Sequence, residues 1–226
     1  MAEHVINGDP PVKVHLRQSG RARRISLRVS RLDGKVTLTH PRGVSQKEAL
    51  AFAYERADWL RGHVAGVPDV VPVALGAVIP VEGAMVQVIP GRRVGLDGGE
   101  LTVNGRPEQA ARRVASFLKT LARDRLAEAS DHYAERLGQR FERISLRDTR
   151  SRWGSCSSRG TLMYSWRLIM APPQVLRYVA AHEVAHLAEM NHSQAFWDGV
   201  TRIHGPYATP RRWLREHGQD LHRYQF

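Results

Sequence analysis

Three residues in the last quarter of the chain have types and spacing suited to metal chemistry. His182 and His186 are four residues apart, so on an α-helix their imidazoles lie one turn apart on the same face and can bind one metal ion. Glu183 follows the first histidine and is positioned to hold a water bound to that metal. This arrangement is typical of a zinc hydrolase.

A catalytic zinc ion keeps three protein ligands and leaves a fourth position for water, so a third ligand is required. His192 follows His182 by the interval at which metzincins place their last histidine, but their glycine is replaced here by Glu189. The chain must therefore reverse elsewhere, and Asn191 tolerates a left-handed conformation best. Glu189 is the rival third ligand, although on a continuing helix it lies ~10 Å along the axis from His182. We expect His192 to complete the site.

Apolar residues at helical spacing predict the elements that carry these histidines. They form one face around the first two histidines, with Val175, Leu176, Val179, Ala180, Val184 and Leu187. A further amphipathic helix follows, with Phe196, Trp197, Val200 and Ile203. Pro210 precedes a short basic helix that ends at Gly218, which we interpret as a closing helix over the core. Upstream, a long helix over about 107–137 is expected to pack against the metal-bearing helix.

A turn-rich segment at 150–157 separates two expected strands, 141–146 and 162–169. Such a hairpin can form the edge beside a metal cleft and offer backbone groups to an extended substrate. The candidate substrate contacts there are Arg152, Trp153, Ser155 and Arg167. The alternative is that Trp153 and Trp166 anchor the core and that the arginines are solvated.

Several single residues have chemistry that the histidine pattern does not explain. Cys156 has three interpretations, which are a buried thiol, a redox-sensitive residue and a zinc ligand. Proton donors to a transition state can be sought among Tyr164, Tyr178, His204 and Tyr207. His217 and His222 are far in sequence from the metal triad and are expected at the surface.

The first half of the chain has the patterns of a scaffold. Residues 1–10 are expected to form a flexible tail, and 11–105 a β-rich region with one helix. Val12, Val14 and Leu16 alternate, 23–40 is expected to form a β-hairpin around Asp33-Gly34, and Ser45 begins a helix at about 45–63. Short strands are expected at 72–75, 77–82, 85–90 and 100–104. Residues 106–226 then form the catalytic region, within one domain of about 20–220.

Composition limits the classes of protein to consider. The chain has 226 residues, 42% of them hydrophobic, and no apolar run approaches the ~18 residues needed to cross a bilayer. A single cysteine excludes an internal disulfide and fits a cytoplasmic protein. The formal charge of +12 suggests nucleic-acid binding, but the basic residues are mostly dispersed arginines. We expect weak nucleic-acid affinity at most, a peptide or protein substrate, and no membrane partner.

Five separate motifs together resemble the YgjP-like metallopeptidase family, which is related to the SprT and WLM zinc-dependent proteases. They are Arg152-Trp-Gly-Ser-Cys-Ser157, Trp166-Arg-Leu-Ile-Met-Ala-Pro-Pro173, His182-Glu-Val-Ala-His186, Asn191-His-Ser193 with Phe196-Trp197, and Arg211-Arg-Trp-Leu-Arg215. The resemblance is dense from about 141 to 215 and extends more weakly to about residue 20. It implies an α+β, zincin-like catalytic domain, in which the metal-bearing helix packs on a long helix and a small antiparallel sheet.

The resemblance and the spacing agree on the chemistry. Both make His182, His186 and His192 the ligands of one Zn²⁺ and Glu183 the catalytic acid and base, which predicts peptide-bond hydrolysis. A second hypothesis keeps the site but hydrolyses a nucleotide phosphoanhydride, with the arginines near 150–167 holding phosphates. A third is a DNA-associated module without catalysis, in which zinc is structural.

Overall fold

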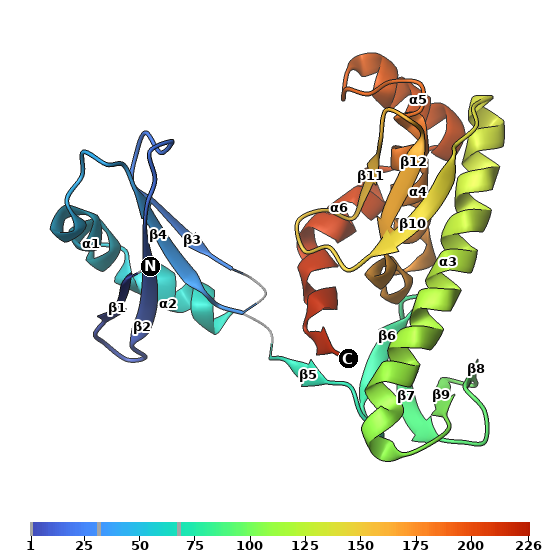
Figure 1. Cartoon of the computed structure of the whole chain (residues 1–226), viewed down its shortest axis with the longest axis horizontal. Coiled ribbons are helices and arrows are strands. Elements are labelled where there is room, and N and C mark those ends of the chain that lie inside the picture. Colours follow the sequence, from blue (N-terminus) through green and yellow to red (C-terminus); the bar gives the residue numbers. More distant parts are fainter. Residues whose placement is uncertain (1, 31–32, 67–68) are drawn as a thin grey trace. The chain divides into compact units, whose positions relative to one another are not determined.

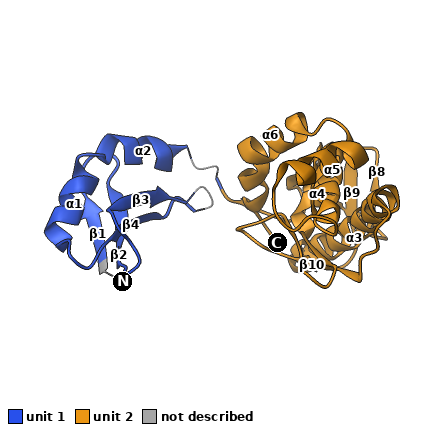
Figure 2. Ribbon diagram, turned by 90° about the horizontal axis from the view of Figure 1, so that it is seen from above, with its two compact units in different colours: residues 1–69 blue, residues 70–226 orange. Residues whose placement is uncertain are grey.

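The protein consists of two compact units, each with its own hydrophobic core. The computed structural model describes residues 2–30, 33–66 and 69–226. Unit 1 comprises Met1–Asp69 and unit 2 Val70–Phe226 (Figure 2). The structure thus divides the chain before the strands of 71–103 and not after residue 105. The reason is that Val81, Val88 and Leu101 are buried in the same core as the long helix.

Unit 1 is a four-stranded sheet with two helices packed against one of its faces (Figure 1). Its elements are β1 (Ala2–Ile6), β2 (Val12–Gln18), β3 (Ser26–Val29), β4 (Val36–His40), α1 (Gln46–Tyr54) and α2 (Ala57–Ala65). The strand order is β1-β2-β4-β3, with β2 and β4 parallel and the two outer pairs antiparallel. Residues 2–6 were expected in a flexible tail, which is wrong, because β1 pairs along β2 and Ile6 is fully buried.

The local predictions for unit 1 are confirmed in part. β3 and β4 form the expected hairpin, with Val29 opposite Val36, so the connection is longer than a two-residue turn. Gly34 is left-handed in that connection, and residues 31–32 lie outside the described part of the chain. Ser45 caps α1 by accepting a hydrogen bond from the Glu48 amide at 3.2 Å. The single helix expected at 45–63 is interrupted, because the backbone leaves the helical conformation at Arg56.

Unit 2 contains the long helix α3 and the helix that carries the histidine motif (Figure 1). Its strands are β5 (Val71–Pro72), β6 (Val78–Val81), β7 (Ala84–Pro90), β8 (Gly95–Asp97), β9 (Glu100–Val103), β10 (Arg143–Arg147), β11 (Gly154–Cys156), β12 (Thr161–Ser165) and β13 (Tyr224–Gln225). Its helices are α3 (Ala110–Leu137), α4 (Pro173–Ala185), α5 (Gln194–His204) and α6 (Ala208–His217), with 3₁₀ turns η1 (Pro107–Gln109), η2 (Trp166–Met170) and η3 (Gly218–His222). None of the described helices is long and apolar enough to span a membrane.

The helices of unit 2 follow the sequence prediction closely. α3 runs for 28 residues and ends where Gly138 takes a left-handed conformation with φ 71°, which costs a glycine little. It packs along α4, as expected, and Leu118, Leu126, Val175 and Val179 are among the buried residues of their common core.

The sheet beside α4 differs from the expected small antiparallel sheet. Its order is β10-β12-β11, with β12 parallel to β10 and antiparallel to β11. The chain leaves β10, forms β11, and returns through β12 between the two, so β11 is an edge strand. The strand expected at 162–169 ends at Ser165, and the following residues form η2. The fold is therefore a mixed helix and sheet structure with several small sheets.

Arg167 of η2 fastens the C-terminal segment to this sheet. Its guanidinium donates to both carboxylate oxygens of Asp148, at 2.6 and 3.1 Å, and to the carbonyls of Leu221 and Tyr224 at 2.9 and 3.0 Å. Arg167 is buried. Burial alone raises the pKa of Asp148, but the hydrogen bond and charge of Arg167 outweigh it and lower that pKa. The ion pair therefore contributes stability above the ordinary carboxyl pKa and loses it as the pH falls.

Replacement of Arg167 tests this fastening. Arg167→Ala is expected to lower the free energy of unfolding by about 2 kcal/mol, because two buried carbonyls and the half-exposed Asp148 carboxylate lose their partner. The free energy of unfolding of Arg167→Lys should lie between those of wild type and Arg167→Ala, since an ammonium group cannot form the two parallel hydrogen bonds of a guanidinium. Urea unfolding at pH 7 measures both, with the exposed Arg159→Ala as the control. The difference between wild type and Asp148→Asn should shrink below about pH 4, and a constant difference would contradict the ion pair.

Candidate metal centre

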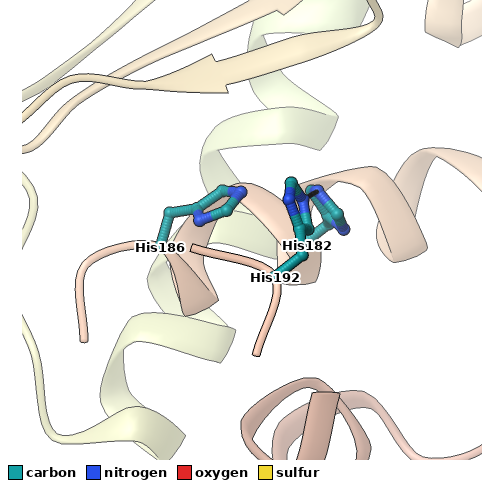
Figure 3. A group of neighbouring side chains, drawn as sticks. All are labelled: His182, His186 and His192. Carbon is teal, nitrogen blue, oxygen red and sulfur yellow. Dashed lines mark hydrogen bonds between the residues drawn. The ribbon is translucent and has the colours of Figure 1, made fainter. Parts of the chain in front are cut away.

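The three histidines singled out by their spacing converge in the structure. His182 lies within α4, His186 ends that helix, and His192 lies on the segment before α5. One ring nitrogen from each lies within 4.8 Å of the others, and Figure 3 shows the three imidazoles gathered at one end of the helix. The Nε2 atoms of His182 and His192 are 3.1 Å apart. Two nitrogens bound to one tetrahedral zinc ion at 2.0–2.1 Å would be about 3.3 Å apart.

Successive tight turns, and not a left-handed residue, bring His192 back to the helix. The Leu187 amide donates to the Val184 carbonyl and the Glu189 amide to the Ala185 carbonyl. Asn191 was expected to be left-handed, which is wrong. Within the described part of the chain, Glu82 is the one non-glycine residue with positive φ. Asn191 contributes its side chain instead, because its Oδ1 accepts the Ser193 amide at 2.9 Å.

Glu189 supports the site through its backbone. The Nδ1 of His186 lies 2.9 Å from the Glu189 carbonyl oxygen. Because a carbonyl only accepts, Nδ1 must carry the proton, and the lone pair of His186 is then on Nε2. A fixed tautomer of this kind is typical of metal-ligating histidines. The Glu189 carboxylate is absent from the group of converging side chains, as judged over the described residues.

Burial favours the neutral form of His182 and His186, and metal binding requires neutral imidazoles. Burial, followed by the charges of His186 and His192, lowers the pKa of His182 to about 3. Burial also lowers the pKa of His186. Neutral imidazoles present lone pairs at pH 7, so the donor set suits a divalent cation such as zinc.

Glu183 lies on α4 against the backbone of β11. It is 5% exposed, and a Cβ atom added to Gly154 would lie 2.5 Å from its Oε1. Only a glycine therefore allows the strand to approach this carboxylate so closely. Burial raises the pKa of Glu183 to about 8, and the positive charge of Arg152 lowers it in part. A carboxyl group with a pKa near neutrality is suited to proton transfer. From the sequence, Gly154 was placed in the turn-rich segment at 150–157 and in the motif that begins at Arg152, without a role of its own.

The four expected substrate contacts separate into two pairs. Arg152 is exposed and close enough to act electrostatically on Glu183, and Ser155 lies on β11. Trp153 instead packs on the C-terminal segment, with its ring 5.3 Å from that of His222. Arg167 instead donates its hydrogen bonds to Asp148 and to the carbonyls of Leu221 and Tyr224. His222 was expected at the surface, which is wrong, because it is partly buried and burial lowers its pKa to about 4.

The remaining candidates differ in how close they lie to the triad. The ring centroid of Tyr178 is 6.0 Å from that of His182, and burial raises the pKa of this tyrosine to about 12. The ring of Tyr207 stacks on that of Tyr178, and the ring centroid of His204 lies 6.0 Å from that of Tyr178. Tyr164 is fully buried, and its hydroxyl forms a hydrogen bond with the Ser130 hydroxyl at 2.9 Å, away from solvent.

Cys156 is partly buried, and His217 is exposed. Burial raises the pKa of the Cys156 thiol to about 11. A protonated thiol is neither a metal ligand nor a strong nucleophile, so the first of its three interpretations is favoured. His217 lies at the surface, as expected, 3.9 Å from Asp220.

An aromatic cluster beside the triad was not singled out from the sequence. Phe196 stacks on His186 with 4.4 Å between ring centroids. The Trp197 ring lies 5.8 Å from His182 and 5.7 Å from His192. From the sequence, both residues were placed in an amphipathic helix and in one of the family motifs but had no role at the site, because periodicity does not distinguish core contacts from contacts with a ligand.

Comparison with known proteins assigns the family. A family model described as the YgjP-like metallopeptidase domain matches residues 23–217. The chain belongs to the YgjP-like metallopeptidase family. The match includes all three histidines, Glu183 and β11. Membership in this family suggests a metal-dependent peptidase, and the three histidines are able to bind the metal.

Other comparisons add little to the YgjP-like assignment. No curated protein matches the chain. A solved structure, described as the crystal structure of the metallopeptidase zymogen of Pyrococcus abyssi abylysin, is 19% identical with a TM-score of 0.37. The similarity covers 42% of this chain and 93% of that one. A TM-score this low does not support a residue-by-residue comparison.

The contact between Gly154 and Glu183 gives a direct test. Gly154→Ala is expected to displace the Glu183 carboxylate or β11 and to lower peptidase activity about 100-fold, as misplacement by 1 Å can do. The control is Gly199→Ala in α5, where an added Cβ meets nothing within 4 Å. Casein hydrolysis and bound metal are measured for both variants. Full activity of Gly154→Ala would contradict the close approach.

Proposed function

We propose that this YgjP-like protein is a zinc-dependent metallopeptidase of the His-Glu-x-x-His type. In this proposal His182, His186 and His192 hold one Zn²⁺, and Glu183 is the general base and acid. The observation that carries the proposal is the convergence of three imidazoles at the end of the helix that also bears the buried Glu183. Two histidines and a glutamate on one helix, with a third histidine after it, favour a zincin-like arrangement.

Glu183 performs the proton transfers in this proposal. A bound Zn²⁺ supplies Lewis acidity and lowers the pKa of water at the centre. The Glu183 carboxylate takes a proton from the water as it attacks the peptide carbonyl, and returns that proton to the nitrogen of the leaving amine. Its burial against Gly154 restricts the carboxylate to one position, so the transfer needs little reorganisation.

The surroundings of Glu183 supply the remaining roles. β11 is an edge strand, so an extended peptide can add to it by backbone hydrogen bonds. Arg152 lies two residues before this strand, its charge acts on Glu183, and it can stabilise negative charge that develops on the carbonyl oxygen. Tyr178, whose ring centroid lies 6.0 Å from that of His182, is the alternative donor. Arg167, which was expected to contact the substrate, is less suited to this role because its donors are engaged.

Metal analysis of three proteins tests the proposal. Wild type and Glu183→Gln are expected to bind about one zinc ion per chain, because Glu183 is not a ligand. His192→Ala should bind zinc at least 10-fold more weakly, because two imidazoles remain. Only wild type should hydrolyse casein, and Glu183→Gln should lose at least 100-fold in rate, as expected for a general base. Mass spectrometry of the metal and a casein assay give the two readouts.

Two outcomes would favour the competing functions. Release of phosphate from nucleoside triphosphates by wild type, with no hydrolysis of casein, would support the nucleotide phosphoanhydride as substrate. Bound zinc without hydrolysis of either substrate would support the non-catalytic DNA-associated module. If His192→Ala retained its zinc, Glu189 would become the candidate third ligand. Glu189→Gln, which keeps the carbonyl that holds His186, is the matched control.

A further inference from the structure

An open groove lies on unit 2 beside the candidate metal centre. It is lined by residues of α5, α6 and the loop between them, among them Thr201, Tyr207, Arg211, Arg212 and Arg215. Tyr207 and Ala208 form part of its wall, and the three arginines are exposed on α6. The groove therefore combines an aromatic wall with a concentration of cationic side chains.

Acidic residues do little to compensate the charge of this groove. Between Asp198 and Glu216 the chain contains four arginines and no acidic residue. Over the part of the chain that the structure describes, Arg211 and Arg212 have no carboxylate within 4.0 Å, and Arg215 has only its neighbour Glu216 at 3.7 Å. Guanidinium groups without a carboxylate partner are suited to bind one from a ligand, because their planar fork matches its two oxygens.

Trp197 joins the groove to the candidate metal centre. Its ring lies 5.7 Å from the ring of His192 on one side and stacks at 5.1 Å on the ring of Tyr207 on the other. The guanidinium carbon of Arg211 lies 4.7 Å from the centroid of the same indole. One tryptophan thus separates the metal-binding histidines from the first arginine of the groove. If a peptide bond is held at the histidines, the side chain one or two residues away from that bond can reach Arg211.

We propose that the groove on α6 is a specificity subsite that binds an acidic side chain of the substrate close to the scissile peptide bond. Arg211 and Arg212 bind the carboxylate, and the rings of Trp197 and Tyr207 contact the aliphatic part of that side chain. This inference rests on the proposed peptidase function and names its substrate class, which is peptides with Asp or Glu beside the cleaved bond. A carboxylate fits the groove better than a long polyanion, because the arginines are confined to one face of a ten-residue helix.

Matched peptides test the subsite. Cleavage sites in a mixed peptide library are first mapped by mass spectrometry with zinc-loaded wild type. A cleaved sequence is then made as three fluorogenic peptides that differ only in Glu, Gln or Lys at the acidic position. Wild type is expected to cleave the Glu peptide about 10-fold faster in kcat/KM than the Gln peptide, with the Lys peptide slowest. The preference should decrease with added NaCl, since exposed charges are screened.

Charge reversal distinguishes recognition from a general effect of charge. Arg211→Glu with Arg212→Glu should invert the order, so that the Lys peptide is cleaved fastest. The matched control is Arg92→Glu with Arg93→Glu, an adjacent exposed pair between β7 and β8, which changes the net charge equally. Arg212→Glu with Arg215→Glu leaves the contact of Arg211 with Trp197 in place, in case that contact is needed for folding.

A second readout does not depend on turnover. The zinc-loaded Glu183→Gln variant should bind the Glu peptide about 10-fold more tightly than the Gln peptide, as measured by fluorescence anisotropy. Equal kcat/KM for the three peptides would overturn the subsite while leaving the peptidase proposal intact. Cleavage of no peptide at all by a zinc-loaded protein would overturn both. An equal change of preference in the Arg92 and Arg93 control would also overturn the subsite.

Discussion

The close approach of β11 to Glu183 is the constraint on which the rest of unit 2 depends. A carboxylate that is 5% exposed must be held at one place, and the absence of a side chain at Gly154 creates that place. β12 fixes β11 by antiparallel pairing, and β10 fixes β12 from its other side. The three short strands thus limit where the Glu183 side chain can lie.

The same packing that buries Glu183 prepares the histidines. α3 packs against α4, whose buried residues run from Val175 to Ala185, so this helix has little freedom to shift. Burial then shifts two pKa values in opposite directions, lowering that of His182 and raising that of Glu183. Both shifts follow from one cause, since a low-dielectric environment disfavours the charged form of either group. A bound cation reverses this situation for the carboxylate, because positive charge stabilises its ionised form.

The features predictable from the sequence are those with a local signal. The periodicity of α3, the cap at Ser45 and the spacing of the three histidines each depend on neighbouring residues, and each has the expected geometry. The contact of Gly154 with Glu183 joins residues far apart in sequence, so no local pattern reveals it. The prediction of a flexible tail at residues 2–6 was wrong because pairing with β2 decides the structure of β1. The prediction of a strand up to residue 169 was wrong because an apolar run fits a strand or a helical turn equally well. The prediction of a left-handed Asn191 was wrong because this residue contributes through its side chain, which accepts a hydrogen bond from the Ser193 amide.

The large positive charge of the chain has a local effect that its total does not reveal. Arg152 acts on Glu183 from the side of β11, and Arg211 acts on His182 from the side of α6. Two exposed arginines therefore act on the candidate centre, and their charge attracts an anionic segment of a substrate before it binds. Such focusing needs only a few charges near the centre, whereas binding to a nucleic-acid backbone needs many charges aligned along it. A net charge of +12 is thus as compatible with an enzyme for acidic peptides as with a nucleic-acid binder, and the position of the arginines beside the histidines favours the enzyme.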